Sequence, residues 1–542
     1  MSSKQKLELT WIGKEDRPKL EPRILVEVPE KSYRAKEKHG ENDIFDNMLI
    51  HGDNLLALKA LEQEFTGKVK CIYIDPPYNT GSAFTHYDDC LEHSIWLGLM
   101  RERLIILQNL LSVSGVIFIS IDDDEYHYLK VLCDEIFGRD NYCGSFIWER
   151  KKKPSFLSNM GIVTEYVLAY AKDKTNSPPF IYGRTTVGKK YPLNNAGNGL
   201  RTISFPPQSV HFGLVDQTVP AQDMSGGNII TRLLNDVVIE NGMNANAFSL
   251  EGEWRYSQGK INNILAAGES IVISRIPFRP NHIKTGGKPK KMKNLLSIAH
   301  YEMATNEDAT KESEALFGTN NSFENPKPEK LISTLISAVS EPGDLVLDSF
   351  LGSGTTAAVA HKLGMRWIGI ELGDHCYTHC IPRLQKVVDG TDQGGISEVV
   401  DWQGGGGFRF YELGESVIDV DDWGQKVIND KFTPDMLIEA VCKVEGFTYA
   451  PSKEEYFIHG YSSEQSFIYV TANYVKADVL HSLSEQLGPK RFLTVYCTGF
   501  DEVSELDNII VKKIPESILK KFEIGRDNYD LNVQAAAEED AR

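Results

Sequence analysis

The sequence lacks any run of apolar residues approaching the roughly 20 that a bilayer-spanning helix needs. Its first 20 residues are polar and charged without a hydrophobic centre, so we expect no secretory signal. The eight cysteines are scattered along 542 residues without a paired framework, which is typical of free thiols in a reducing compartment. These absences argue against a membrane-spanning or disulfide-stapled secreted protein and predict a cytoplasmic location.

Several chemical signatures are missing as well. No glycine-rich turn continues into Gly-Lys-Ser or Gly-Lys-Thr, so the phosphate-binding loop of an ATPase is absent, and no nuclease constellation is evident. The segment 375–380 holds two histidines and two cysteines, but their spacing is not that of a standard zinc site. The acidic run at 122–125 suits a helix N-terminus better than a magnesium site. We therefore predict no metal ion in this chain.

Over most of the chain, basic residues are fewer than acidic residues. The 58 Lys and Arg face 76 Asp and Glu, a formal net charge of −18 that argues against a protein coating nucleic acid by bulk attraction. From Ser145 to His300, however, 20 basic residues stand against 10 acidic ones, a local net charge of +10. This distribution predicts that a polyanion contacts the centre of the chain, although a solvated basic surface would have the same composition.

The length predicts two to four domains, because one core does not extend over so long a chain. Apolar strands alternate with amphipathic helices from 48 to 170 and again from 329 to 388, the pattern of a doubly wound α/β sheet. Between 173 and 322 the alternation stops, and paired prolines, paired glycines and many asparagines indicate an inserted domain of short strands. A smaller α/β unit follows after about Phe432. We expect an N-terminal arm at 1–47, a first sheet segment at 48–172, the insert at 173–321, a second sheet segment at 322–403 and a C-terminal domain at 404–542.

The tetrapeptide Asp75-Pro76-Pro77-Tyr78 follows the apolar run 71–74. Asp75 supplies a carboxylate acceptor, and the rigid Pro-Pro turn fixes the direction of the Pro76 carbonyl, a second acceptor. Tyr78 offers a flat face on which a base withdrawn from a duplex can stack. The set suits the exocyclic amine of a nucleobase. A simple strand-ending turn would contain the same letters, but the carboxyl edge of a buried strand is where α/β sheets bind ligands.

A second loop, 350–356, follows the apolar run 345–347 and reads Phe-Leu-Gly-Ser-Gly-Thr-Thr. Its glycines allow close backbone approach to a cofactor at a helix N-terminus. The loop lacks the third glycine of the dinucleotide pattern, since Ala357 stands there. Glu371 ends the next strand, where an acid that binds a ribose belongs, although a helix-capping role would place it there too.

The two motifs in this order resemble those of β-class amino-methyltransferases, which use S-adenosyl-L-methionine. More narrowly, the chain resembles the modification subunit of type III restriction–modification systems. The narrower resemblance is carried by the stretches 9–14, 74–81, 115–123, 323–328, 406–411 and 528–533. It spans nearly the whole chain except the insert. It implies a circularly permuted, Rossmann-like methyltransferase sheet interrupted by a target-recognition domain, in the cytoplasm of a prokaryotic cell.

The resemblance also implies roles for individual residues. Asp75, Pro76, Pro77 and Tyr78 would form the catalytic motif. The cofactor S-adenosyl-L-methionine would be bound by Asp348, Phe350, Gly352, Gly354 and Thr355 in the glycine loop, by Glu371 at the ribose, by Asp53 near the adenine, and by Asn325 and Lys327 near the methionine end.

What the resemblance implies for partners is equally specific. The substrate would be adenine N6 in double-stranded DNA, contacted mainly through 145–321. Apart from the resemblance, the run Lys151, Lys152 and Lys153 is a candidate for phosphate contacts, although a solvated loop would have the same composition. The chain would form a homodimer and associate with a separate restriction subunit that carries ATPase and nuclease activities. The C-terminal domain is our candidate for the subunit contacts.

Several alternatives stay open at this point. A cytosine-N4 methyltransferase shares the mechanism but usually has Ser in place of Asp75. A stand-alone adenine methyltransferase would need no restriction partner, and a non-catalytic DNA-binding module could retain the fold. An NAD-dependent enzyme could use the glycine loop, but the motif order and the missing third glycine count against it. No Pro-Cys dipeptide is present, which argues against a cytosine-C5 enzyme.

Overall fold

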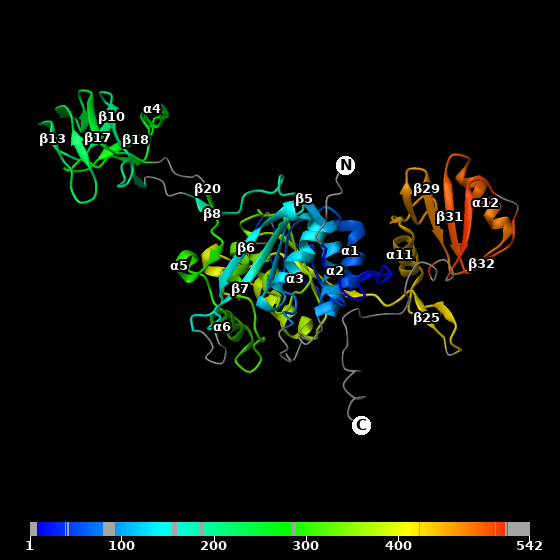
Figure 1. Cartoon of the computed structure of the whole chain (residues 1–542). Helices are drawn as coiled ribbons and strands as arrows, with labels where there is room; N and C mark the ends of the chain where they lie inside the picture. Colours follow the sequence, from blue (N-terminus) through cyan, green and yellow to red (C-terminus); the bar gives the residue numbers. More distant parts are fainter. Residues whose placement is uncertain are drawn as a thin grey trace. The chain divides into compact units, whose positions relative to one another are not determined.

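The computed structural model describes residues 8–37, 40, 43–79, 93–153, 160–184, 189–283, 289–421, 423–503, 506–514 and 518. The chain divides into two compact units (Figure 1): a first unit made of 1–180 and 293–542, and a second unit made of 181–292. The second unit is narrower than the insert expected at 173–321, because the helical segment after 293 folds with the first unit. None of the helices in the described part of the chain combines the length and the apolar character needed to span a bilayer.

An eleven-stranded sheet forms the centre of the first unit. Along the sheet the strands are β1 (Leu25–Glu27), β24 (Gly407–Leu413), β3 (Asn47–His51), β23 (Arg366–Glu371), β22 (Leu345–Asp348), β4 (Val69–Ile74), β5 (Leu111–Ile121), β7 (Thr164–Ala171), β6 (Tyr142–Glu149) and β21 (Leu295–Leu296), with β2 (Tyr33–Arg34) paired to β24. The strands from β24 to β5 are parallel to one another, and β7 is antiparallel to both of its neighbours. The central strands are almost continuously buried, as parallel strands covered on both faces must be.

The order of the strands identifies where a ligand site belongs. The chain runs from β3 through β4 to β5 toward one edge, and from β22 through β23 toward the other. The direction therefore reverses between β22 and β4, which are hydrogen-bonded neighbours through Val346–Cys71 and Leu347–Ile72. In open α/β sheets, ligands bind outside the carboxyl ends of the strands at such a switch point. The segment that contains β4 precedes the segment that contains β22 in the sequence, which gives the permuted order of the sheet.

Helices connect the parallel strands of the first unit. They are α1 (Asn54–Phe65), α2 (His93–Leu110), α3 (Asp123–Cys133), α5 (Ile298–Tyr301), α6 (Asn306–Phe317), α7 (Glu329–Ile336), α8 (Thr355–Lys362), α9 (Ile381–Val388) and α10 (Ser397–Val400). The helices α1, α2 and α3 pack against one another, as do α7, α8 and α9. Right-handed crossovers in opposite directions along a sheet place the two helix groups on opposite faces. The first group lies in front of the sheet in Figure 1.

Local sequence explains where several of these helices begin. The Asp53 carboxylate accepts a hydrogen bond from the Leu56 amide and caps α1. Asp122 caps α3 by accepting from the Asp124 amide, which confirms the helix N-terminus predicted for the acidic run. Gly354 has a φ of +80° and precedes α8 directly. The loop between β22 and α8 therefore turns within a few residues, as glycine allows.

Two predicted boundaries differ from those of the structure. The region expected as an N-terminal arm contributes β1 and β2, which pair with β24, and so belongs to the edge of the main sheet. The boundary expected at 404 falls just before β24, which is also part of that sheet. The glycines at 404–407 pack closely rather than link domains: a Cβ on Gly407 would lie 2.5 Å from the Tyr33 carbonyl oxygen.

The described residues of the second unit, 181–184, 189–283 and 289–292, form short strands and one helix. A seven-stranded sheet has the order β12 (Gln217–Val219), β15 (Val237–Glu240), β16 (Met243–Asn244), β11 (Val210–Phe212), β18 (Ser270–Ile273), β19 (Asn281–Ile283) and β9 (Lys190–Pro192). A four-stranded sheet has the order β10 (Leu200–Phe205), β17 (Phe248–Glu253), β14 (Thr231–Leu233) and β13 (Gln222–Asp223), and α4 (Gln258–Ala266) and the ribbon of β8 (Ile181–Arg184) and β20 (Pro289–Lys291) complete the unit. Its core is rich in buried aromatic side chains, among them Phe205, Phe248 and Trp254.

The C-terminal part of the first unit forms a smaller α/β assembly with its own buried clusters. It contains the five-stranded sheet β27 (Thr448–Tyr449), β28 (Gly460–Ser463), β29 (Ser466–Val470), β31 (Phe492–Cys497) and β33 (Ile509–Lys513), the helices α11 (Pro434–Glu445) and α12 (Ala477–Leu487), and the pairs β25 (Ile418–Val420) with β26 (Lys426–Ile428) and β30 (Tyr474–Val475) with β32 (Gly499–Phe500). Strands β29, β31 and β33 and helix α12 lie in the smaller α/β unit expected after about Phe432. The stretch 528–533 lies outside the described residues, as do Thr80 and Gly81.

Candidate active site

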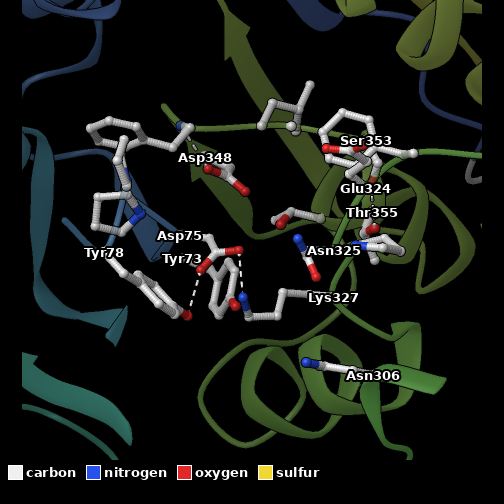
Figure 2. Close-up of a pocket in the computed structure, with 18 of the residues that line it drawn as sticks. Tyr73, Asp75, Tyr78, Asn306, Glu324, Asn325, Lys327, Asp348, Ser353 and Thr355 are labelled. Atoms are coloured by element: carbon white, nitrogen blue, oxygen red, sulfur yellow. Dashed lines mark hydrogen bonds and ion pairs between the residues drawn. The ribbon is translucent and has the colours of Figure 1, made fainter. Parts of the chain in front are cut away.

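The neighbouring strands β4 and β22 bring two loops together at their carboxyl ends. We call residues 75–79 the Asp75 loop and residues 348–354 the Gly352 loop. Both line one cavity of about 400 Å³, shown in Figure 2. Its lining is Tyr73, Asp75, Pro76, Pro77, Tyr78, Asp122, Arg150, Glu165, Asn306, Phe323, Glu324, Asn325, Pro326, Lys327, Asp348, Phe350, Leu351, Gly352, Ser353, Thr355 and Thr356. The cavity thus lies at the switch point of the sheet, where topology predicts a ligand site.

The Asp75 loop is held at several points. The Trp96 indole nitrogen donates to the Pro77 carbonyl oxygen at 2.8 Å. Asn79 has a φ of +60°, and its side-chain amide donates to Glu125 at 2.7 Å. At the start of the loop, the Tyr78 hydroxyl donates to Asp75 Oδ1 at 2.9 Å. These contacts fix the carboxylate of residue 75 at the cavity wall.

Charged groups from distant parts of the chain surround Asp75. The Lys327 ammonium donates to Asp75 Oδ2 at 2.8 Å, and Figure 2 shows Asp75 between Lys327 and Tyr78. Glu165, a buried residue on β7, lies with Oε2 3.2 Å from the Tyr78 hydroxyl and 3.8 Å from Lys327 Nζ. Arg150 follows β6 and donates to Glu165 Oε1 at 2.6 Å. These contacts connect Asp75, Lys327, Glu165, Arg150 and Tyr78 in one polar network.

The network has a marked effect on protonation. Burial lowers the pKa of Lys327, but the negative charges of Asp75 and Glu165 outweigh it, so that the net pKa is raised. Burial raises the pKa of Tyr78 well above its usual value, and the carboxylates of Asp75 and Glu165 act in the same direction. At neutral pH the site therefore contains an ammonium ion and a neutral phenol.

The Gly352 loop uses carboxylates to orient backbone amides. Asp348 Oδ1 accepts from the Phe350 amide at 2.9 Å. Glu371 Oε2 accepts from the Gly352 amide at 2.6 Å, while its Oε1 accepts from the Leu372 and Gly373 amides at 2.8 and 3.0 Å. Burial raises the pKa of Asp348 to about 7. Glu371 thereby fastens this loop to the end of the neighbouring strand β23.

Ten of the thirteen predicted site residues line the cavity, and three do not. Asp53 is buried as the cap of α1, with Arg103 3.6 Å from its carboxylate. Gly354 packs against Cys380: a Cβ added to Gly354 would lie 3.5 Å from the Cα of Cys380. Glu371 is bound to the amides named above. The cofactor roles of these three residues stay predictions, and Glu371 acts on the cavity through the loop it holds.

The sequence reasoning missed Glu165, Arg150 and Asp122 as cavity residues. A carboxylate inside the apolar strand 164–170 was the available signal for Glu165, because buried charges require partners. Asp122 directly follows β5 at the same sheet edge as Asp75, and burial raises its pKa to about 7. Nothing in the sequence near Arg150 distinguished it from the lysines that follow.

The side chains of 375–380, weighed above as a metal cluster, make other contacts. His375 Nε2 lies 3.0 Å from Glu371 Oε1, and the Cys380 thiol lies 3.1 Å from the Gly352 carbonyl oxygen. His379 contacts Thr378 and the Asn321 carbonyl oxygen. Cys380 thus contacts the Gly352 loop directly, and His375 contacts it through Glu371.

Comparison with known families decides the class of this site. Residues 69–380 match the family described as DNA methylase, a range that includes β4, the whole second unit and the Gly352 loop. The chain belongs to the DNA methylase family. The match begins at the first residue of β4 and ends at Cys380, just after β23, so it contains both loops of the cavity.

Curated relatives are similar over a larger part of the chain. The "Probable type III restriction-modification enzyme HindVI Mod subunit" of Haemophilus influenzae is 32% identical over 421 residues, which cover 70% of this chain and 55% of the relative. The type III EcoP15I Mod subunit of Escherichia coli is 29% identical over 415 residues, 67% of this chain and 63% of the relative. The type II methyltransferase M.EcaI of Enterobacter cloacae is 29% identical over 343 residues, 60% of this chain and 67% of the relative. The alignments span about half to two thirds of the type III relatives' length.

Proposed function

We propose that this chain transfers a methyl group from S-adenosyl-L-methionine to N6 of adenine in double-stranded DNA, as the modification subunit of a type III restriction–modification system. The observation that carries the proposal is the meeting of Asp75 and the Gly352 loop in one cavity at the switch point of the sheet. Family membership and the similarity to type III Mod subunits support the same class of reaction. A DNA substrate in a prokaryotic cell also implies a cytoplasmic location.

The residues present fit the proposed cofactor. The cavity is within the usual size range for small-molecule sites, and the Gly352 loop with Phe350, Ser353 and Thr355 supplies an aromatic ring and hydroxyls at one wall. Asn325 lies at the same wall as Lys327 in Figure 2. When bound, S-adenosyl-L-methionine would supply an electrophilic sulfonium methyl group. The Gly352 loop, Asn325 and Thr355 would hold it.

The Asp75 loop supplies what the nucleophile needs. The lone pair of an exocyclic amine is delocalised into the ring, so the amine nitrogen is a weak nucleophile. Asp75 would accept one N–H of the amine and the Pro76 carbonyl the other, which holds the nitrogen in line and draws electron density toward it. Tyr78 would stack on the extruded base. The aspartate at position 75 is the feature that favours adenine over cytosine.

The second unit is our candidate for the DNA-reading domain. The segments 181–192 and 281–292, through which the chain enters and leaves this unit, contain seven Lys and Arg and no Asp or Glu. Strands β8 and β20 pair antiparallel in these segments, and Lys290 and Lys291 are exposed on β20. A positively charged ribbon suits the phosphate backbone of a duplex, because Lys and Arg that neutralise phosphates favour binding by releasing counterions.

A salt titration tests the ribbon. Replacing Lys290 and Lys291 by Ala should weaken DNA binding and lower the slope of log K against log salt by about 0.9 for each phosphate that is no longer neutralised. Lys453→Ala with Lys490→Ala, two exposed lysines of the C-terminal assembly, is the matched control. An unchanged slope in the ribbon variant would remove the ribbon from the DNA-binding surface.

The proposed assembly has two parts. We propose a homodimer of this chain, with the C-terminal assembly as the contact region, and a separate restriction subunit that supplies ATPase and nuclease activities. Sedimentation of the full chain should give twice its mass of 60.8 kDa. A single-chain mass at micromolar concentration would contradict the dimer, and methyl transfer without retention of any co-expressed restriction subunit would favour a stand-alone enzyme.

Nucleoside analysis tests the reaction itself. DNA treated with the purified chain and isotopically labelled S-adenosyl-L-methionine is digested to nucleosides, and the labelled product is identified. We expect N6-methyladenine. Labelled N4-methylcytosine would overturn the adenine assignment, and DNA binding without any label would support the non-catalytic module. Methylation-aware sequencing of the same DNA gives the recognition site for the experiments below.

A further inference from the structure

The hydrogen bonds of Asp75 lead to an inference that rests on the proposed function. Asp75 must accept the target amine, yet both of its carboxylate oxygens already have donors. Tyr78 occupies Oδ1 at 2.9 Å and Lys327 occupies Oδ2 at 2.8 Å. Figure 2 shows both contacts from opposite sides of the carboxylate. A base that enters the cavity must therefore compete with a charged donor.

A second acceptor for both donors is already in place. Glu165 Oε2 lies 3.2 Å from the Tyr78 hydroxyl and 3.8 Å from the Lys327 ammonium. A shift of Lys327 Nζ of about 1 Å would bring it within ordinary hydrogen-bond distance of that oxygen. The two groups that block Asp75 therefore share one alternative partner, on a different strand of the sheet.

Burial makes this alternative partner necessary. The side chain of Lys327 is 11% exposed and that of Glu165 is 4% exposed. An ammonium ion that loses its only partner in such a place is strongly destabilised. Arg150 holds the other oxygen of Glu165 at 2.6 Å, and its amide bonds to the Val163 carbonyl, so Glu165 is fixed while Lys327 has a longer, rotatable chain. The moving member of the pair is Lys327.

We propose that Glu165 is a positioning residue which accepts the hydrogen bonds of Lys327 and Tyr78 when the target amine takes their place on Asp75. Lys327 thereby keeps the carboxylate of Asp75 paired in the absence of DNA and releases it when an amine-bearing base enters. No covalent bond changes in the exchange. Glu165 acts through Lys327 and Tyr78 and touches neither base nor cofactor.

The exchange can be measured by binding, without turnover. Two duplexes carry the recognition site with either adenine or unsubstituted purine, which lacks the amine, at the target position. The ratio of their dissociation constants, measured with a cofactor analogue that has no transferable methyl group, reports the contact between the amine and Asp75. We expect a ratio of about ten or more for the wild-type chain, as for a hydrogen bond to a charged acceptor.

Two backgrounds separate the exchange from a structural role of Glu165. In Glu165→Gln, Lys327 has no second carboxylate and stays on Asp75, so the ratio should fall below about two. In Lys327→Met nothing blocks Oδ2, and the ratio should equal or exceed the wild-type value whether residue 165 is Glu or Gln. Arg150→Met removes the hydrogen bond from Arg150, after β6, to Glu165 on β7. It shows how much the ratio changes when this connection between the two strands is lost and Glu165 itself is retained. Glu135→Gln, which removes one of the two carboxylates paired with Lys14 outside the cavity, is the matched control and should leave the ratio unchanged.

Each outcome is decisive. A wild-type ratio retained in Glu165→Gln overturns the exchange, and so does a ratio that falls equally in the presence and absence of Lys327. If Arg150→Met alone reproduces the fall in both backgrounds, Glu165 acts through the sheet rather than through Lys327. A wild-type chain that neither prefers adenine nor transfers methyl groups instead refutes the proposed function.

Discussion

The two loops of the cavity use carboxylates in opposite ways. In the Asp75 loop the carboxylate faces the cavity, and a cation and a phenol hold it in position. At the Gly352 loop the carboxylates of Asp348, which also lines the cavity, and of Glu371 on β23 accept hydrogen bonds from backbone amides of the loop and hold them in position. One loop exposes a paired carboxylate to the cavity, whereas the backbone of the other is fixed by carboxylates.

This difference matches the demands of the two proposed ligands. An exocyclic amine needs a charged acceptor that changes its partner when the base arrives, so a side chain with an exchangeable ion pair is suitable. A nucleotide-like cofactor needs a fixed surface, which closely packed glycines and immobilised amides provide. Substitutions in the first loop should therefore affect turnover, and substitutions in the second should affect cofactor affinity.

The largest expected effect is that of Asp75→Ala. Methyl transfer should fall by about 10³-fold or more, because the amine loses its charged acceptor. Cofactor affinity should stay within about twofold, since Asp75 belongs to the loop that does not bind the cofactor by its backbone. Glu165 is available to pair with Lys327 in this variant, so the fold is retained. Single-turnover kinetics and equilibrium cofactor binding are the two measurements, and an equal loss in both would erase the distinction between the loops.

Glu371→Gln, which affects the second loop, should weaken cofactor binding and leave turnover nearly unchanged. The carboxamide keeps the volume but replaces one acceptor oxygen by a donor, so at least one of three backbone amides loses its partner. We expect the cofactor dissociation constant to rise about tenfold, the usual cost of one such bond, with little change in turnover at saturation. Glu412→Gln, a partly exposed carboxylate on β24 that pairs with Lys31, is the control. Turnover reduced at saturating cofactor would show that the loop does more than bind.

Tyr78 distinguishes the ring from the hydroxyl within the first loop. Tyr78→Phe removes the donor to Asp75 and Glu165 but keeps the stacking face. It should lower turnover only about three- to tenfold, since one hydrogen bond to Asp75 is removed while Lys327 still pairs with this carboxylate. Tyr78→Ala should additionally weaken binding of duplexes with an extruded base by about tenfold, because base–aromatic stacking is removed as well. If the two variants behaved alike, the ring would have no role in holding the base.

Much of this site could be predicted from sequence because its two loops end apolar strands. The runs 71–74 and 345–347 indicated parallel strands, and carboxyl ends of parallel strands share one edge of a sheet. Glu371 was predicted to end the next strand, and β23 ends at this residue. What made Asp75 and Gly352 predictable is that each motif lies within a few residues of the strand that places it.

The remainder depends on pairings between residues far apart in sequence. Glu165 reaches the cavity because β7 pairs antiparallel with β6 in a register that sets Trp148 opposite Glu165. A shift of one residue would turn its carboxylate to the other face, and the local sequence does not specify that register. The domain boundary predicted at 404 coincides with a run of four glycines at 404–407. In the structure close backbone contacts with Tyr33 and Gly390 account for two of these glycines.

The smallest expected effect concerns the pH dependence of stability and comes from the second loop. Burial raises the pKa of Asp348 to about 7 in the folded chain, whereas an unfolded chain has the ordinary value of 3.8. Above about pH 4 the folded state therefore keeps a proton that the unfolded chain has released. This contribution to stability is complete at low pH, declines as the pH rises toward 7, and is constant above it. Asp348→Asn, which cannot titrate, should lose less stability than the wild-type chain between about pH 5 and 7.5, by a few degrees in Tm. Asp122→Asn removes a second carboxyl of the same cavity, a half-buried one whose pKa is also about 7. Thermal unfolding of both variants at three pH values separates the contributions of Asp348 and Asp122. Identical pH profiles for wild type and Asp348→Asn would show that Asp348 does not hold the proton.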